Sequence, residues 1–319
     1  MTAMNRHGFT LLELAVVLAI IAIMTHLAVR ETGRWRSSQL REMSNRGLLE
    51  IKEAVQGSDF ERDSDGARAR TGFLADMGRM PLARTNQLGR LSLAELWTSP
   101  SPAENYAARE AVATNLVPGS EAADADADVV VAGGWRGPYV RLPLGKTRLQ
   151  DAWGNAYEVP DEAAYSVRLC GTDGAPVDRP GAQVAIIRHL GADGTPDEVR
   201  PPESQENQDL TLDLLAGPGP DAFTNATLTI TVNAYDADGN PAVASTYSGT
   251  VRVYGPRGGQ VAVCKQTFSV SAGTAHATVS GLTPGPRVLR VECNGRKGLP
   301  RLFVIQPGAN SATDRLKIN

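Results

Sequence analysis

The chain has 319 residues, of which 42% are apolar and 21% are charged. A chain of this length usually folds as two domains, and this balance excludes a protein that is disordered throughout. The net charge of -3 argues against a nucleic-acid-binding surface, which would need an excess of Lys and Arg. The three cysteines are too few for a disulfide scaffold.

The first element is an apolar segment at residues 9–29 that contains one formal charge, Glu13. As a helix it would be about 31 Å long, enough to cross the roughly 30 Å hydrocarbon core of a bilayer. A carboxylate inside such a span is costly and marks a function or a partner. The span's histidine, His26, lies toward its opposite end. We therefore expect the partner of Glu13 to come from another chain or from a positive charge created near the N-terminus.

The residues Gly8-Phe9-Thr10-Leu11-Leu12-Glu13 resemble the processing site of type IV pilins and pseudopilins. In that family a prepilin peptidase cuts after the glycine, and the new N-terminal residue is methylated. The resemblance implies that residues 1–8 are a leader removed after Gly8 and that Phe9 becomes the methylated terminus. The Phe9 amine of one subunit would then meet the Glu13 carboxylate of a neighbour. Such a buried pair sets the axial register of a filament more than it adds stability.

The same resemblance implies a location and a set of partners. The chain would cross the bacterial inner membrane once, with its later domains in the periplasm and its filament in the periplasm or at the cell surface. The implied partners are further copies of the chain, other pilins or pseudopilins, the prepilin peptidase and the inner-membrane assembly platform; nucleic acid is not expected. The positive-inside rule conflicts with this orientation, since a series of arginines follows the span: Arg30, Arg34, Arg36 and Arg41.

Behind the span the helix is expected to continue as an amphipathic segment. Apolar residues from Leu40 to Val55 recur at spacings of three and four, and Gly57 with Ser58 supplies a stop. The sequence thus predicts one helix over residues 9–56. Its first part would pack against other subunits, and its second part would lie against a globular head.

The head is assigned to residues 57–215. Within it, Ser101-Pro102-Ala103-Glu104 has the pattern of a capping box, which predicts a helix that runs to Asn115 or Leu116. The acidic run at residues 121–128 alternates with alanine and contains no glycine, so it forms no coordinating turn. It is interpreted as a solvated loop.

Three later segments carry the patterns of a turn, a hairpin and a buried strand that leads into a tight turn: residues 134–139, 151–159 and 185–194. In the hairpin, Gly154-Asn155 supplies the turn. In order and approximate spacing, these segments resemble the head of the major pseudopilin of type II secretion. The hairpin of that family has prolines where this chain has Ala152 and Ala156.

In that family the loop after the last of these motifs binds calcium through backbone carbonyls and aspartates. The resemblance implies that the Leu190 carbonyl and the Asp193 carboxylate bind Ca²⁺ here, with Asp209 as the distal ligand and Asp197 as the second choice. Hard oxygen ligands on a flexible loop suit this ion. The alternative interpretation, that Asp193-Gly194 is only a turn, stays open at this point.

The last part of the chain is predicted to be a separate domain. Residues 216–222 have the composition of a linker, and short alternating runs separated by turn residues follow over residues 223–319. Seven such runs favour a β-sandwich, similar to immunoglobulin-like or transthyretin-like modules. The expected fold class is therefore α+β: a long N-terminal helix on a small antiparallel-sheet head, followed by an all-β sandwich.

Two features of the sandwich have alternative interpretations. Cys264 and Cys293 fall in predicted strands and could form a disulfide in an oxidising periplasm, leaving Cys170 reduced. Residues 236–241 resemble half of a calcium loop but lack the later acidic ligand, so a hairpin turn is favoured.

No motif for a catalytic site is found, so an enzyme is not expected. The leading hypothesis is a structural subunit of a type II secretion pseudopilus or a related type IV pilus-like filament. The alternative hypothesis is a surface pilin whose sandwich is an adhesive or ligand-binding module. An exposed aromatic or apolar patch on residues 222–319 would favour the alternative.

Overall fold

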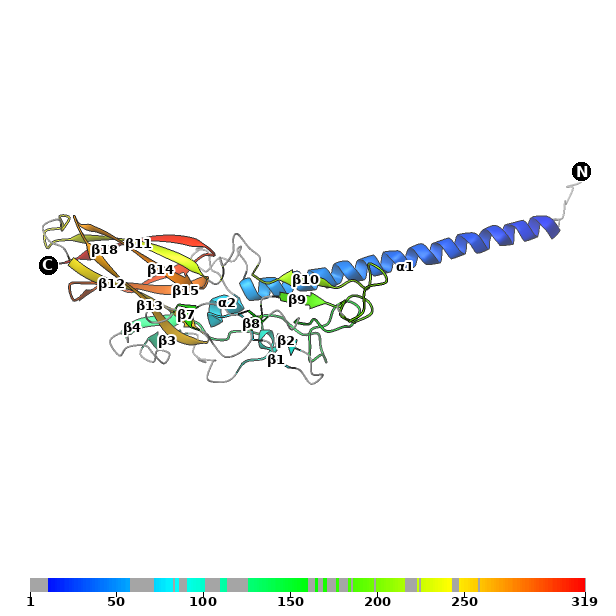
Figure 1. Cartoon of the computed structure of the whole chain (residues 1–319), viewed down its shortest axis with the longest axis horizontal. Coiled ribbons are helices and arrows are strands. Elements are labelled where there is room, and N and C mark those ends of the chain that lie inside the picture. The colour runs from blue at the N-terminus through cyan, green and yellow to red at the C-terminus, as the bar shows by residue number, and fades with distance from the viewer. Residues whose placement is uncertain are drawn as a thin grey trace, which may run out of the picture.

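The computed structural model describes residues 11–57, 72–82, 84–85, 91–100, 110–113, 126–159, 164–165, 169–170, 176–177, 183–184, 186–197, 199–215, 223, 225–242, 247–257 and 259–318. Over these ranges the chain is α+β, as the sequence predicted. A long helix, α1 (Leu11–Gln56), projects from one end of the molecule, and a β-sandwich forms the other end (Figure 1). Between them lies a head built from short elements.

The helix α1 ends where the sequence predicted, at Gln56, and Gly57 follows with a positive φ of 81°. Only one stripe of it is buried, made of Ser44, Leu48, Ile51 and Val55. These positions are spaced by three or four residues, so they lie on one face of the helix. The head therefore covers one side of the last turns and leaves the remainder of the helix uncovered.

The head core is an apolar cluster against that stripe. Its members from the head include Phe73, Leu74, Met77, Leu96, Val140, Tyr157, Val159, Ile187 and Leu214. Phe73, Leu74 and Met77 lie on α2 (Phe73–Met77), Leu96 lies on η1 (Ala94–Leu96) and Ile187 lies on β9 (Ile186–His189), and the other members lie in connecting segments. The head also contains β1 (Arg84–Thr85), β2 (Leu91–Ser92), β5 (Ala164–Tyr165), β6 (Leu169–Cys170), β7 (Pro176–Val177), β8 (Gln183–Val184) and β10 (Leu210–Asp213). Strands β9 and β10 form an antiparallel pair beside α1.

The predicted hairpin over residues 151–159 is confirmed in its main features. Gln150 pairs with Ala156 as an antiparallel bridge, and the Asp151 carboxylate accepts hydrogen bonds from the backbone N–H groups of Trp153 and Asn155, at 3.0 and 2.8 Å. Tyr157 is buried in the head core, as the alternating pattern predicted. The predicted strand before the Asp193-Gly194 turn is likewise present as β9.

The helix predicted from the capping box is wrong where the structure can test it. Residues 101–109 and 114–116 lie outside the described residues, but Glu110–Ala113 form a strand, β3, paired antiparallel with β4 (Asp126–Ala132). A cap is worth only about 1 kcal/mol. The burial of Val129 and Val131 on β4 is a tertiary interaction that outweighs such a local preference.

The acidic run is also not a solvated loop throughout, because Asp126 begins β4 and is 7% exposed. Its Oδ2 accepts a hydrogen bond of 2.6 Å from Nη1 of Arg290, a residue of the sandwich that is itself buried. The neighbouring Asp128 remains exposed. A carboxylate of this run therefore serves as a buried counter-charge, which its own local sequence does not reveal.

The predicted β-sandwich is present as two antiparallel-rich sheets around one core. The strands are β11 (Ala226–Tyr235), β12 (Tyr247–Arg257), β13 (Gln260–Val270), β14 (Thr274–Leu282), β15 (Gly285–Cys293), β16 (Arg296–Lys297), β17 (Arg301–Ile305) and β18 (Ala309–Lys317). One sheet has the order β14-β11-β18, and the other has β13-β12-β15-β16 with β17 also on β15. Alternate residues of β11, from Ala226 to Ala234, point into the core.

The last strand, β18, begins at Ala309 and pairs in parallel with β11 over its whole length. Its first residues are mostly exposed or half-buried, since it lies at a sheet edge, and only Asp314 and Leu316 are buried. An edge strand of this kind carries little apolar alternation for a sequence pattern to detect.

The head and the sandwich are joined by a third layer. Val129 and Val131 of β4 pack with Tyr254, Val261, Val263 and Val288, which lie on the face of the β13-β12-β15 sheet that points away from the sandwich core. That sheet is therefore buried on both faces. The domains predicted from the linker composition share a hydrophobic interface, although residues 216–222 themselves lie outside the described residues.

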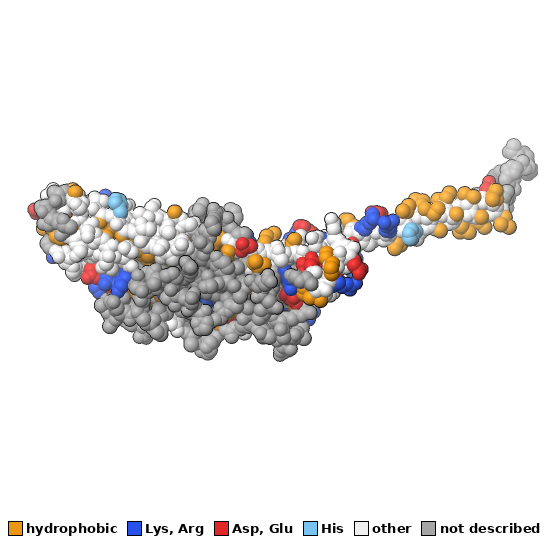
Figure 2. Space-filling view, viewed as in Figure 1, with side chains coloured by type: hydrophobic (Ala, Val, Ile, Leu, Met, Phe, Trp, Pro, Cys, Tyr) orange, Lys and Arg blue, Asp and Glu red, His pale blue; other side chains and the backbone are white. Residues whose placement is uncertain are grey.

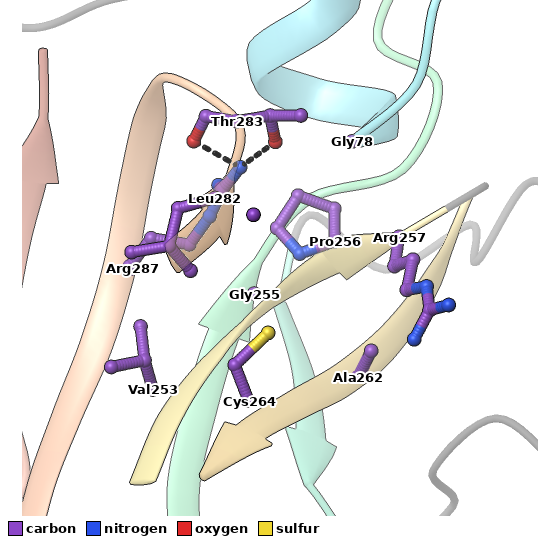
Figure 3. A pocket seen from close by; sticks show the side chains of 11 residues that line it. Gly78, Val253, Gly255, Pro256, Arg257, Ala262, Cys264, Leu282, Thr283 and Arg287 are labelled. Carbon is purple, nitrogen blue, oxygen red and sulfur yellow. Dashed lines mark hydrogen bonds between the residues drawn. The ribbon is translucent and has the colours of Figure 1, made fainter. Parts of the chain in front are cut away.

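Close backbone packing completes this interface. A side chain on Gly78, which ends α2 with a φ of 62°, would collide with the Pro256 carbonyl, and the Gly259 N–H donates a 2.8 Å hydrogen bond to the Met77 carbonyl. Beside this contact is a crevice of about 30 Å³, room for roughly one water molecule (Figure 3). The Arg287 guanidinium donates to the Thr283 carbonyl and hydroxyl at its wall.

We predict that Asp126→Ala lowers the free energy of unfolding by about 3 kcal/mol, because Arg290 would stay buried without its main counter-charge. Chemical denaturation of the purified chain in detergent measures this change. Asp128→Ala is the matched control: its carboxylate is 3.7 Å from Arg290 but 77% exposed, so we expect a loss below about 1 kcal/mol. Equal losses in the two variants would contradict the assignment.

Candidate functional site: the N-terminal helix and the head loop packed on it

The first half of α1 is an apolar surface with nothing from the described chain upon it. Residues 11–29 are all exposed, and Leu11, Leu18 and Ile23 are exposed by 87, 58 and 62%. An 18-residue stretch has a mean hydropathy of 2.4 with none of it buried. Apolar side chains cover this part of the helix in Figure 2. By length and composition this stretch can cross a membrane.

Glu13 interrupts this apolar surface near its N-terminal end. It lies in the first described turn of α1 and is exposed on the helix surface. Gly8 and Phe9, the expected cleavage site and new terminus, lie outside the described residues. The structure therefore places Glu13 at the surface of the helix, and the pairing with a neighbouring Phe9 stays a prediction.

The head is held on α1 by polar residues for which the sequence predicted no contact with the head. The Ser37 hydroxyl donates to the Glu206 carboxylate at 2.5 Å, and the Arg41 guanidinium donates to the Gln205 carbonyl. One turn further on, the Ser44 hydroxyl accepts the N–H of Ala152 at 3.0 Å. These helix residues extend the buried apolar stripe toward the membrane span at the same spacing. A polar continuation of an amphipathic stripe was the signal that could have revealed them.

His189, at the end of β9, fixes the same contact from the head side. Its Nε2 lies 3.1 Å from Oδ1 of Asn45 on α1, and its Nδ1 accepts the Gly191 N–H at 3.2 Å. This arrangement fits a neutral ring protonated at Nε2. Burial, and secondarily the charge of Arg41, lowers the pKa of His189 to about 4. The histidine is therefore neutral at pH 7.

The predicted calcium ligands lie in one loop region but are already engaged with backbone groups. The Asp193 carboxylate accepts the Thr195 N–H at 3.2 Å, as in a turn. Asp197 and Asp209 each accept the other's backbone N–H, at 3.2 and 3.1 Å. Leu190 is fully buried. Among the residues that the structure describes, no group of three or more His, Cys, Asp or Glu side chains is placed to hold a metal ion.

An arginine lies next to the same aspartates. Nη1 of Arg188 is 3.7 Å from Oδ2 of Asp209, and its Nη2 is 3.8 Å from Oε2 of Glu158. The positive charge in this region is thus supplied at least in part by the chain itself. Oδ1 of Asp197, in contrast, is buried without a hydrogen-bond partner, so an additional cation would satisfy this atom.

The disulfide that the sequence allowed between Cys264 and Cys293 is not formed, and both thiols are reduced and buried. They lie on β13 and β15, the two strands that flank β12. Cys264 pairs with Val253 of β12, and Cys293 pairs with Gly249. Two strand spacings put the cysteines more than about 9 Å apart, beyond the roughly 7 Å reach of a disulfide. Burial raises the pKa of the Cys293 thiol.

The turn at residues 236–241 is confirmed. Oδ1 of Asp236 accepts the N–H groups of Asp238 and Asn240, at 3.0 and 2.8 Å, and Tyr235 pairs with Pro241 across the turn. The carboxylate that a calcium loop would use therefore closes the turn instead.

Comparison with known proteins identifies the N-terminal segment. Residues 3–29 match the family described as the prokaryotic N-terminal methylation motif. No curated protein sequence matches the chain. Two solved structures of a pilus-presented adhesin, Cpa, align with it at 9 and 8% identity, with TM-scores of 0.19 and 0.14. The alignments cover 44 and 30% of this chain and 39 and 28% of the adhesin chains.

The matched motif begins in the expected leader and ends where the apolar half of α1 ends. The N-terminal part of the chain thus carries a prokaryotic N-terminal methylation motif on a helix that is long and apolar enough to cross a membrane. Such a motif implies cleavage by a prepilin peptidase and assembly into a pilus-like filament.

Acid should weaken the contact between head and helix through His189. Its unfolded-state pKa of about 6.5 exceeds the folded value of about 4, so the unfolded chain binds more protons between these values. Stability is therefore lost as the pH falls from about 6.5 toward 4. We expect this group to remove about 1–2 kcal/mol from the free energy of unfolding, measured by urea denaturation in detergent at pH 7 and pH 4.5.

The variant His189→Gln serves as the control, because Asp151 changes the free energy of unfolding in the opposite direction on acidification. Burial raises its pKa to about 6, so its proton uptake adds stability as the pH falls from about 6. Asp151 is present in both the unaltered chain and His189→Gln, so its contribution cancels in the comparison. His189→Gln should lose less stability on acidification than the unaltered chain, and an equal loss would show that His189 is not the titrating group.

Proposed function

We propose that this protein is a structural subunit of a type II secretion pseudopilus or a related type IV pilus-like filament. A prepilin peptidase removes residues 1–8, and Phe9 becomes the methylated terminus. Before assembly, the subunit is anchored in the inner membrane with its head and sandwich in the periplasm. The assembly platform then moves it into a helical filament with further copies and other pilins or pseudopilins.

The observation that carries this proposal is the coincidence of the methylation motif with a bare apolar helix. Residues 3–29 carry the motif, and the helical part of that stretch has no cover from the described chain. A soluble protein would bury such a helix. In a filament subunit this helix must be exposed at two stages: it contacts lipid before assembly and the helices of neighbouring subunits after assembly.

The surface of the sandwich supports a building-block role over the adhesin alternative. In the described part of residues 223–318, the large apolar side chains that are exposed are Leu299 and Leu302, by 83 and 68%. This pair is far smaller than the contiguous patches that usually mark a binding face. No exposed aromatic side chain accompanies it among the described residues.

We expect Glu13→Gln to abolish or strongly reduce filaments while leaving folding, insertion and cleavage intact. The substitution removes the counter-charge for the neighbouring Phe9 amine but keeps a polar side chain of nearly the same size, so the effect reports the charge. Electron microscopy of sheared filaments measures assembly, and mass spectrometry measures the mature N-terminus.

Glu31→Gln is the matched control, because Glu31 lies on the same helix beyond the span and forms only an exposed pair with Arg34. It should assemble normally. Normal filaments from Glu13→Gln would remove the registration role, and a mature protein that starts anywhere except Phe9 would overturn the proposed function.

We further propose that the loop of Asp193, Asp197 and Asp209 binds Ca²⁺, with the Leu190 carbonyl as a fourth ligand. The buried, unpartnered Oδ1 of Asp197 supports this.

Saturating Ca²⁺ should raise the melting temperature of the detergent-solubilised chain by about 5 °C relative to the same chain in chelator, since the ion binds only the folded state. Asp197→Asn should abolish the shift, and Asp236→Asn, in the other aspartate turn, should keep it. A chain indifferent to Ca²⁺ and chelator would refute the site.

A further inference from the structure

Between the apolar span and the head, α1 has a short stretch that touches nothing else in the described chain. Residues 30–36 are all exposed, and the first contact with the head is made by Ser37. This stretch contains Arg30, Arg34 and Arg36, together with Trp35, whose side chain is 66% exposed. We call these four residues the arginine collar.

The collar carries more positive charge than its own surroundings neutralise. Glu31 is the acidic residue of the stretch, and it pairs with Arg34 at 3.1 Å with both side chains more than half exposed. The other two arginines add positive charge to the helix surface beside it. In Figure 2 a basic group is visible between the apolar part of the helix and the head. Such a charge excess next to an apolar span attracts anions.

The position of the collar matches the headgroup layer of a bilayer. The hydrocarbon core is roughly 30 Å thick and the whole bilayer about 40–45 Å, so each headgroup layer is about 5–8 Å deep. In a continuous helix that leaves the core at Val29, the Cα atoms of Arg30 to Arg36 lie about 1.5–10.5 Å beyond the core. Helical side chains lean toward the N-terminus, here toward the membrane, so Trp35 and Arg36 reach back into this layer.

The angular spread of the collar favours a lipid surface over a single protein partner. At 100° per residue, Arg30 and Arg34 share one side of the helix, whereas Trp35 and Arg36 lie on other sides. A docking partner would meet one side only, whereas lipid headgroups surround the helix. A tryptophan beside arginines at the end of an apolar span is also typical of a membrane–water interface.

From this geometry we propose that the arginine collar binds the phosphates of anionic phospholipids and sets the depth of the subunit in the membrane before assembly. The inference rests on the membrane span of the proposed function. It also gives a reason for arginines on the side of the span where the positive-inside rule does not place them. As long as these arginines stay bound to the lipid headgroups, they would hold the head just above the bilayer until the subunit is extracted.

The test uses the full chain in phosphatidylcholine vesicles that contain one fifth phosphatidylglycerol. Bromine, which quenches tryptophan at short range, is placed on the acyl chains of the phosphatidylglycerol alone or of an equal mole fraction of the phosphatidylcholine. Subtracting the Trp35→Phe variant isolates the Trp35 signal. Since each surface arginine is worth about fivefold in binding to an anionic surface, we expect brominated phosphatidylglycerol to quench Trp35 at least about twofold more strongly.

The variant Arg30→Gln/Arg34→Gln/Arg36→Gln should make the two brominated lipids quench equally. The control Arg46→Gln/Lys52→Gln changes cations of the same helix that lie about 25 Å or more beyond Val29, and it should keep the preference. Equal quenching by the two brominated lipids in the unaltered chain would contradict the binding of anionic lipid by the arginine collar. An unchanged preference for brominated phosphatidylglycerol in the triple variant would contradict it as well.

Extraction with alkaline carbonate separates this failure from failure of the proposed function. Unaltered chain that resists extraction but shows no lipid preference refutes only the collar. Unaltered chain that is released by carbonate refutes the span, and the proposed function with it. A triple variant that keeps its lipid preference but no longer forms filaments would assign the arginines to a neighbouring subunit instead.

Discussion

The structure depends on one continuous helix that meets two kinds of surroundings. In its last turns, α1 buries a single stripe from Ser44 to Val55 against the head, so it behaves as an ordinary amphipathic helix. In its first half, apolar side chains face outward on all sides and are not covered by the described chain. Because no break separates the halves, whatever holds the first half also fixes the position of the head.

The contacts between the head and α1 are polar at the end of the interface that lies nearest the apolar half of the helix. Arg41, Asn45 and His189 join the two by hydrogen bonds where the apolar stripe gives out. Hydrogen bonds of this kind add little net stability, but they specify one register between helix and head. A head that slid by one turn along the helix would leave His189 and its partners buried and unsatisfied.

The parts of the fold that local sequence could predict are those that local physics decides. The end of α1 follows from Gly57, and the alternation in β11 follows from a sheet with one core face. Strands β3 and β4 could not be predicted in this way. The apolar partners of β4 and the counter-charge of Asp126, Arg290, lie far along the chain, 164 residues away in the case of the arginine. Of the candidate site, the span and Glu13 were evident from sequence, whereas Ser37, Arg41 and His189 became meaningful only once the head was placed.

Because the β13-β12-β15 sheet is apolar on both faces, the linker at residues 216–222 is not needed to hold the head and the sandwich together. Tyr254, Val261 and Val263 are covered by a strand that precedes the linker in sequence, and Asp126 is tied to Arg290 across the same boundary. The peptide bonds of residues 216–222 are therefore not the main connection between the two halves of the molecule. A protease that cut the chain there would produce a nicked subunit whose two pieces stay together, and the sandwich would travel with the filament even without a covalent link to it.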